Sequence, residues 1–386
     1  MSQLALLLNS IVVYFMKNLK SVVLTIIFVI SSFYGISQTQ VGGTINAHAT
    51  WSKAKSPYVI SSNVTLSSGK QLIIEPGVKV QFAAGTKMTI KGSLIANGNA
   101  SDSIAFTSIS ATDKDSWSGI EISSAEGLAI NFDYCKFLYA SSALNKNFSL
   151  SAVPVSIKNS SFRSNETALT GVLSLTKNMT VENCSFKDNT YAITQGFMTF
   201  NNCMFDKNVN GLYQTLQIDV LNSVFANNSQ IALNAGIGTV EGCLVDNNNI
   251  GIKAYTNGLT VSNNSITNNN IGLILEAALD GTVPPVTNNQ ICDNTTYNVK
   301  NNSSTNVELF TNCFCSTDSA NIETKIYDGL DDSSFGLIDY TLFDEDCFTP
   351  VYKTDKLQNK IIYLSIEKDT QTGSFKLYPN PTKNDL

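Results

Sequence analysis

Apolar side chains between Phe132 and Cys315 recur at fixed places in a unit of 19 to 25 residues. If Cys184 is position zero, the equivalent positions are Cys135, Ser160, Cys184, Cys203, Ser223, Cys243, Asn264, Asn289 and Cys313. Three places earlier, the residues are Phe132, Ile157, Val181, Phe200, Val220, Val240, Val261, Val286 and Phe310. Two places after position zero stand Phe137, Phe162, Phe186, Phe205, Phe225, Val245, Ile266 and Ile291, and then Cys315 breaks the series. With a third apolar column nine places after zero, the pattern predicts three short strands per unit, stacked as a solenoid.

Asparagine occupies two further fixed places in the unit. Five places after position zero it fills seven successive units: Asn165, Asn189, Asn208, Asn228, Asn248, Asn269 and Asn294. Directly before position zero most units also have asparagine, with Tyr134 and Gly242 as exceptions. Asparagine tolerates the left-handed backbone conformation, and stacked amides can hydrogen-bond to one another. Because loop asparagines would not keep a fixed offset, we predict that the seven form a ladder.

The chain before the repeat consists of short apolar runs separated by turns that contain glycine, such as Gly69, Gly77 and Gly85. This alternation is typical of strands and predicts further coils from residue 58 onward. A solenoid with an open end would expose unpaired strand edges. We therefore expect residues 38–57, around Trp51, to form an N-terminal cap.

The asparagine pattern, followed by Gly251-Ile252 in one unit and Gly272-Leu273 in the next, resembles the right-handed parallel β-helix proteins of the pectin-lyase-like superfamily. The resemblance implies an all-β fold, a right-handed parallel β-helix of about twelve coils. This solenoid would span residues 58–346, including a C-terminal cap in which a short helix covers the last coil. It does not imply one activity, because this fold carries lyases, hydrolases, adhesins and scaffolds.

The N-terminal residues have the pattern of an export signal. Lys17 and Lys20 precede an apolar run over residues 22–34, which is followed by small residues up to Ser37. This arrangement predicts a signal peptide over residues 1–37, a true start at Met16, and cleavage between Ser37 and Gln38. The alternative is a membrane anchor, although about 13 apolar residues are few for a bilayer.

The C-terminal residues suggest how the protein is exported. Residues 347–374 are polar and without repeat, and we expect a linker there. The sequence from Lys376 to Thr382 resembles the onset of the C-terminal sorting domain of the type IX secretion system of Bacteroidetes. The resemblance implies a truncated sorting domain over 375–386, the type IX machinery as a partner, and an extracellular or outer-membrane-surface location. Ser103 and Ser319 lie in triplets that resemble the O-glycosylation acceptor of the same bacteria.

The charge of the chain limits the classes of partner that it can bind. The formal net charge is −6, with a single arginine, Arg163, and a single histidine, His48. Such a chain is not expected to bind nucleic acid, whose phosphates attract basic proteins.

Of the eight cysteines, those at position zero are expected to be buried thiols. Export favours a disulfide near the C-terminal end, and we predict a bond between Cys315 and Cys347, with Cys292 and Cys313 as competitors.

The repeat shows no constellation typical of a catalytic site. A β-elimination requires a base and a cation, and a glycosidase requires two carboxylates across the bond. Glu182 and Glu241 share an offset but stand three units apart. We assign no catalytic, metal or cofactor residue and expect a monomeric, non-catalytic surface scaffold that contacts glycans or other surfaces. The alternatives are a lyase or glycoside hydrolase acting on an extracellular polysaccharide, and a passenger module that positions other domains.

Overall fold

The computed structural model describes residues 38–110, 112–123, 129–146, 154–171, 179–278, 281–345, 347, 351–355, 360–368 and 375–379, with Tyr14 and Met16. Met1–Thr39 and Gln40–Leu386 are two separate compact units. The expected signal peptide, including Ser37, therefore lies outside the described residues apart from Tyr14 and Met16. Among the described residues, no helix has the length and apolar character needed to cross a membrane.

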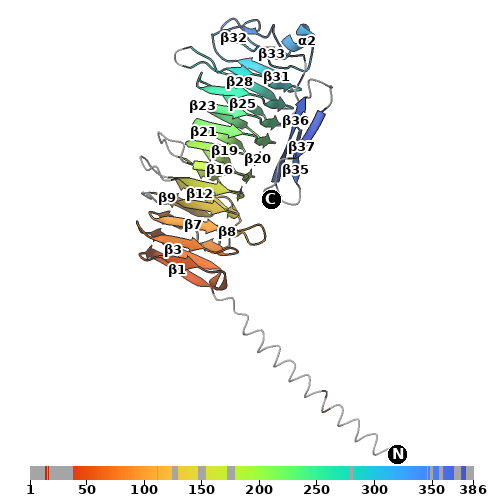
Figure 1. The fold of residues 1–386 in the computed structure, drawn as a ribbon. Coiled ribbons are helices and arrows are strands. Elements are labelled where there is room, and N and C mark those ends of the chain that lie inside the picture. The colour runs from red at the N-terminus through yellow and green to blue at the C-terminus, as the bar shows by residue number, and fades with distance from the viewer. Residues whose placement is uncertain are drawn as a thin grey trace, which may run out of the picture. The chain divides into compact units, whose positions relative to one another are not determined.

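The second unit is built of coils, each of which places strands on three faces (Figure 1). The first face contains β2 (Ala49–Trp51), β4 (Gln71–Ile74), β7 (Ser93–Asn97), β10 (Ile130–Asp133), β13 (Val155–Lys158), β16 (Met179–Glu182), β19 (Phe197–Asn201), β26 (Leu259–Ser262) and β29 (Val286–Thr287). The second face contains β5 (Lys79–Phe82), β8 (Ile104–Ser108), β11 (Cys135–Leu138), β14 (Ser161–Arg163), β17 (Ser185–Lys187), β20 (Met204–Asp206), β22 (Val224–Ala226), β24 (Leu244–Asp246), β27 (Ser265–Thr267) and β30 (Gln290–Cys292). The third face contains β1 (Thr39–Ile45), β6 (Lys87–Ile90), β9 (Trp117–Ile122), β12 (Ala140–Lys146), β15 (Thr167–Thr170), β18 (Tyr191–Thr194), β25 (Ile250–Ala254), β28 (Ile271–Leu275), β31 (Tyr297–Asn301) and β33 (Ile326–Tyr327).

Three longer strands each pair on two faces: β3 (Tyr58–Leu66), β21 (Asn210–Leu221) and β23 (Ile231–Glu241). Neighbouring coils pair in parallel, as in β13 with β16 and β14 with β17. This topology confirms the predicted parallel β-helix of about twelve coils.

The apolar columns of the sequence fill the interior of the coils. Six phenylalanine rings on the second face stack face to face with centroid separations of 4.5 to 5.0 Å: Phe106, Phe137, Phe162, Phe186, Phe205 and Phe225. All six are fully buried. Because parallel strands in register bring equivalent residues together, one phenylalanine per coil is enough to build a continuous aromatic core.

The predicted asparagine ladder is present at the corner between the second and third faces. From Asn165 to Asn294, each side-chain amide donates to the side-chain oxygen of the next asparagine at 2.8 to 3.1 Å. Each amide also donates to a main-chain carbonyl of the preceding coil, as Asn228 does to Phe205 at 3.0 Å. The ladder ends within one coil, where Asn294 donates to Asn298 at 3.0 Å. All seven side chains are buried, so the ladder satisfies polar groups that water does not reach.

The register of the last repeat differs from the prediction by one residue. Gln290 pairs with Cys313, and Asn289 donates to Asn312, so Asn312 and not Cys313 occupies position zero. With this shift Phe314 lies two places after zero and is buried, which restores the apolar column that Cys315 had broken. A one-residue slip matters because successive side chains on a strand point to opposite faces.

The two ends of the solenoid differ in how far they match expectation. Residues 38–57, expected to be a cap, supply β1 and β2, which pair with β3 and β4 and so belong to the first coil. A short 3-10 helix, η1 (Lys53–Lys55), follows, and Trp51 stacks on Tyr58 with ring centroids 4.8 Å apart. At the other end β32 (Val307–Glu308) pairs with β34 (Ile338–Asp339). The expected short helix is α2 (Ser319–Glu323), which buries Ile322.

The segment expected to be a linker contains two strands. β35 (Val351–Asp355) and β36 (Lys360–Lys368) pair in antiparallel fashion, and β36 also pairs with β37 (Phe375–Pro379). Ile361, Ile362 and Tyr363 have high β-propensity and favour this pairing, but the polar residues around them hid this signal in the sequence.

Candidate functional site

The corner between the first and second faces requires a left-handed residue in nearly every coil. This residue stands directly before position zero and has φ of 49° at Asn222, 57° at Asn263 and 57° at Asn288. Asparagine suits this conformation because its short side chain can hydrogen-bond locally. The same turn that shapes the backbone therefore points an amide outward on each coil that has asparagine at this position.

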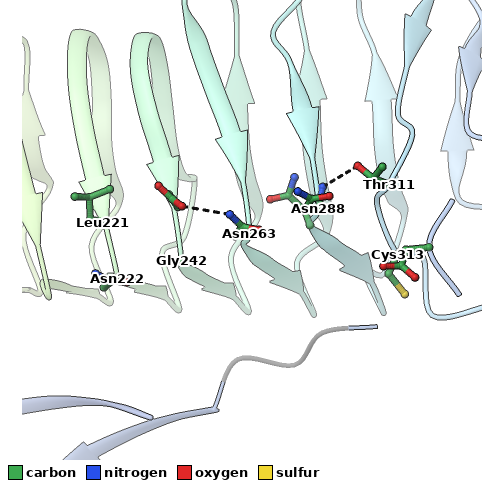
Figure 2. A pocket seen from close by; sticks show the side chains of 10 residues that line it. Leu221, Asn222, Gly242, Asn263, Asn288, Thr311 and Cys313 are labelled. Carbon is green, nitrogen blue, oxygen red and sulfur yellow. Dashed lines mark hydrogen bonds between the residues drawn. The ribbon is translucent and has the colours of Figure 1, made fainter. Parts of the chain in front are cut away.

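These outward amides line a groove across successive coils (Figure 2). Its volume is about 650 Å³, and its described lining residues are Leu221, Asn222, Glu241, Gly242, Asn263, Asn288, Asn289, Thr311, Cys313 and Asp344. The Asn263 amide donates to Glu241 Oε1 at 3.2 Å, and Thr311 Oγ1 accepts from the main-chain N–H of Asn288 at 3.3 Å. The same corner position thus recurs along the groove at the coil spacing of about 4.8 Å.

Gly242 leaves a gap in the row of amides. Its φ of 62° matches that of the asparagines above and below it, but it carries no side chain. A Cβ at this position would lie 2.8 Å from Asn222 Oδ1. The glycine therefore keeps the corner conformation while deepening the groove between Asn222 and Asn263.

The segment after β34 closes the groove at the C-terminal end. The main-chain N–H of Thr311 donates to Leu342 O at 3.0 Å, and that of Asp344 donates to Asn312 O at 3.0 Å. These bonds bring the exposed Asp344 carboxyl group to the groove.

The groove is negatively charged. It contains the carboxyl groups of Glu241 and Asp344, and none of its described lining residues is Lys, Arg or His. Arg163 instead pairs with Asp188 at 3.1 Å, and His48 accepts from the main-chain N–H of Gln71 at 3.2 Å. Amides and carboxylates offer donors and acceptors to hydroxyl groups, whereas the two carboxylates would repel a polyanion.

The structure corrects the predicted disulfide. Cys315 is bonded to Cys292, and Cys347 is bonded to Cys313, so Cys315 and Cys347 belong to different bonds. The Cys347 and Cys315 sulfur atoms are nevertheless only 3.5 Å apart. Both competitors named from the sequence are thus used, because the last coil and the following segment bring all four cysteines to one place.

The remaining cysteines behave as core thiols. Cys135, Cys184, Cys203 and Cys243 are free and buried on the column of position zero. Burial raises the pKa of the Cys203 and Cys243 thiols to about 12, so they stay protonated. Because their apolar, buried surroundings disfavour the thiolate form, these cysteines are unsuitable as nucleophiles.

The other predicted site residues lie apart from the groove's lining residues. Ser103 is half-buried, and its neighbour Asp102 accepts from Lys53 Nζ at 2.6 Å. Ser319 is exposed on α2, whose N-cap is Asp318. Gln38 is exposed directly before β1.

Sequence reasoning recognised the corner asparagines but read them as structural only. The amides of Asn183 and Asn202 support that interpretation, because Asn202 donates to Asn183 at 2.7 Å. The row of asparagines is interrupted at Gly242, with Glu241 beside it, and both residues line the groove.

No family model matches the chain, and no curated protein sequence matches it. Several solved structures resemble it at low identity. The A-module of the mannuronan C-5 epimerase AlgE6 from Azotobacter vinelandii is 12% identical, with a TM-score of 0.38 over 81% of this chain and 90% of that chain. A double mutant of the periplasmic alginate epimerase AlgG is 12% identical, with a TM-score of 0.41 over 67% of this chain and 78% of that chain. The tailspike protein gp49 of Acinetobacter baumannii bacteriophage Fri1, a capsular polysaccharide depolymerase, is 12% identical, with a TM-score of 0.25 over 86% of this chain and 61% of that chain. The parallel β-helix itself is established by the strand register of this chain.

Proposed function

We propose that this protein binds an extended, neutral polysaccharide in the corner groove and does not cleave it. The observation that carries the proposal is the groove itself, in which Asn222, Asn263 and Asn288 present side-chain amides from different coils beside the Glu241 carboxylate. A polymer with a regular repeat can make the same contact on several coils, because a solenoid repeats its surface along one axis.

The chemistry of the lining residues selects for hydroxyl groups. An asparagine amide donates two hydrogen bonds and accepts two, and a carboxylate accepts several. Neighbouring sugar hydroxyls need such combined donors and acceptors. The Glu241 and Asp344 carboxylates disfavour binding of an anionic polymer in the groove, since like charges repel.

The repeat's Glu182 and Glu241 do not form the carboxylate pair that a glycosidase requires. Glu182 and Glu241 are related by three successive coil steps, through Asn201 and Leu221, which is roughly 14 Å at the spacing of strands. Two carboxylates of a glycosidase act about 5 to 9.5 Å apart. The described lining of the groove also offers no basic side chain to neutralise a uronate during β-elimination.

Export is part of the proposal. The signal peptide over 1–37, with cleavage before Gln38, and the type IX sorting segment over 375–386 would place the groove outside the cell or on the outer-membrane surface. N-terminal sequencing of the secreted protein is expected to begin at Gln38. A soluble extracellular product that retains residues 16–37 would contradict this part without affecting the groove.

The decisive experiment combines binding and cleavage on one panel. Purified protein is titrated calorimetrically with neutral glucans, mannans and xylans and with alginate and pectate. Reducing ends and unsaturated sugars are then measured with and without calcium. We expect binding to a neutral polymer without product. Binding to none of the neutral polymers would refute the proposal, and product formation would establish the alternative of a polysaccharide lyase or glycoside hydrolase.

A further inference from the structure

The four C-terminal cysteines form one sulfur cluster at the end of the solenoid. Cys292 ends β30, Cys313 pairs with Gln290 of the same strand from the next coil, and Cys315 and Cys347 follow. The sulfur atoms of Cys313, Cys315 and Cys347 all lie within 4.8 Å of one another. Cys292 is not one of these three, but its sulfur atom is bonded to that of Cys315 and so adjoins them.

A buried glutamine points into this cluster. The Gln290 side chain is 9% exposed, and its Nε2 lies 3.5 Å from both Cys292 Sγ and Cys315 Sγ. Its Oε1 has no hydrogen-bond partner among the described residues. The main-chain N–H of Cys315 also donates to Cys313 Sγ at 3.3 Å. Donors that converge on sulfur stabilise a thiolate far more than a neutral disulfide, because charge strengthens the hydrogen bond.

We propose that Cys292, Cys313, Cys315 and Cys347 form a redox-gated metal site, which holds two disulfides when oxidised and one zinc ion when reduced. One molecule of a dithiol reductant delivers two electrons and two protons to each disulfide and is itself oxidised to a cyclic disulfide. Two molecules therefore reduce both disulfides. Zinc then displaces the four thiol protons and binds the four thiolates. Soft thiolate ligands select zinc over calcium or magnesium.

Three of the four sulfur atoms already lie within 4.8 Å of one another, so the exchange requires the Cys292 side chain to rotate toward them. A tetrahedral site with Zn–S bonds of about 2.3 Å places its sulfur atoms about 3.8 Å apart. The Cys315 and Cys347 sulfur atoms are already 3.5 Å apart. The bonded pairs have Cα separations of 5.8 Å and 5.3 Å, so side-chain rotation separates their sulfur atoms. Cys315 is exposed, which gives the reductant and the metal a route to the cluster.

Cobalt titration of the full chain tests the site. The protein is reduced with dithiothreitol, freed of reductant without oxygen, and titrated with Co²⁺, whose visible absorption reports tetrahedral thiolate coordination. We expect one equivalent to bind, Zn²⁺ to displace it, and the oxidised protein to give no signal. Cys292→Ser is expected to weaken binding at least about tenfold. Cys243→Ser, which alters a buried thiol outside the cluster, is expected to bind as the wild type does.

Two outcomes would overturn the proposal. One is a reduced wild type that keeps its circular dichroism spectrum but binds no Co²⁺. The other comes from alkylation of the reduced wild type, which does not depend on any variant. Zinc is expected to protect the four cluster cysteines from alkylation, and equal labelling with and without zinc would refute the site.

Discussion

Asn263 and Asn268 lie on the same coil, and each donates its side-chain amide to a carboxylate of the preceding coil. Asn263 donates to Glu241 at 3.2 Å, and Asn268 donates to Asp246 at 2.7 Å. Both are exposed, and their φ values are 57° and 56°. They differ in position, because Asn263 lines the groove and Asn268 lies at the corner between the second and third faces.

This pair separates binding from folding. We expect Asn263→Ala to weaken polysaccharide binding about fivefold, since one hydrogen bond contributes about 1 kcal/mol. Asn268→Ala should leave affinity unchanged while costing the same backbone strain. Calorimetric titration of both variants with the polymer that binds wild type measures the difference. Equal loss of affinity in the two variants would show that binding does not use the groove.

The ladder makes a second prediction, about stability. Asn248 accepts from Asn228 at 2.8 Å and donates to Asn269 at 2.9 Å, and its side chain is buried. Asn248→Ala should lower the free energy of unfolding by about 1 to 3 kcal/mol, because buried partners lose their hydrogen bonds. The adjacent Asn249 is exposed, so Asn249→Ala serves as the control. Identical urea midpoints for the two variants would contradict a stabilising ladder.

The free thiols should be inert in the folded protein. Cys135, Cys184, Cys203 and Cys243 are buried, and burial raises the pKa of each thiol. A chromogenic thiol reagent at pH 8 should therefore label none of the four in the native, oxidised protein. In denaturant it should label all four at once. Rapid labelling without denaturant would mean that the coils open locally.

Lys146 should make stability depend on pH. Its side chain is 5% exposed at the end of β12, and burial lowers its pKa to about 8. Between about pH 8 and 10.4 the unfolded chain holds a proton that the folded chain has released, so this group favours folding more as pH rises. Lys146→Met removes the charge and keeps an apolar stem. We expect the variant to be more stable at pH 7 and its advantage to shrink by pH 10, measured as urea midpoints. A difference that stays constant from pH 7 to 10 would rule out this titration.

The sequence predicted the fold because each coil repeats the same physical constraints. A ladder residue such as Asn208 must hydrogen-bond to the asparagines of both neighbouring coils, so its position within the repeat is fixed. Phe186 and Phe205 stack for the same reason. The strand columns could therefore be read directly from spacing.

The register of the last coil could not be predicted from spacing in this way. Asn312 and Cys313 both resemble residues found at position zero in earlier units, and only the pairing of Gln290 with Cys313 decides between them. The disulfides follow from that register, which no local pattern encodes. The groove was missed because it depends on the approach of Asp344 from a segment outside the repeat.

The end of the ladder at Asn298 also limits assembly. An array of identical layers is a natural fibre subunit, because its final layer offers the next molecule the same unfilled hydrogen bonds that each coil offered its successor. Asn294 instead donates to Asn298 within its own coil, at 3.0 Å. Asn298 therefore takes the place that the asparagine of a further coil would occupy. Among the described residues, the ladder of Asn165 to Asn294 is thus completed within the chain, since its last amide bonds to Asn298 of the same coil.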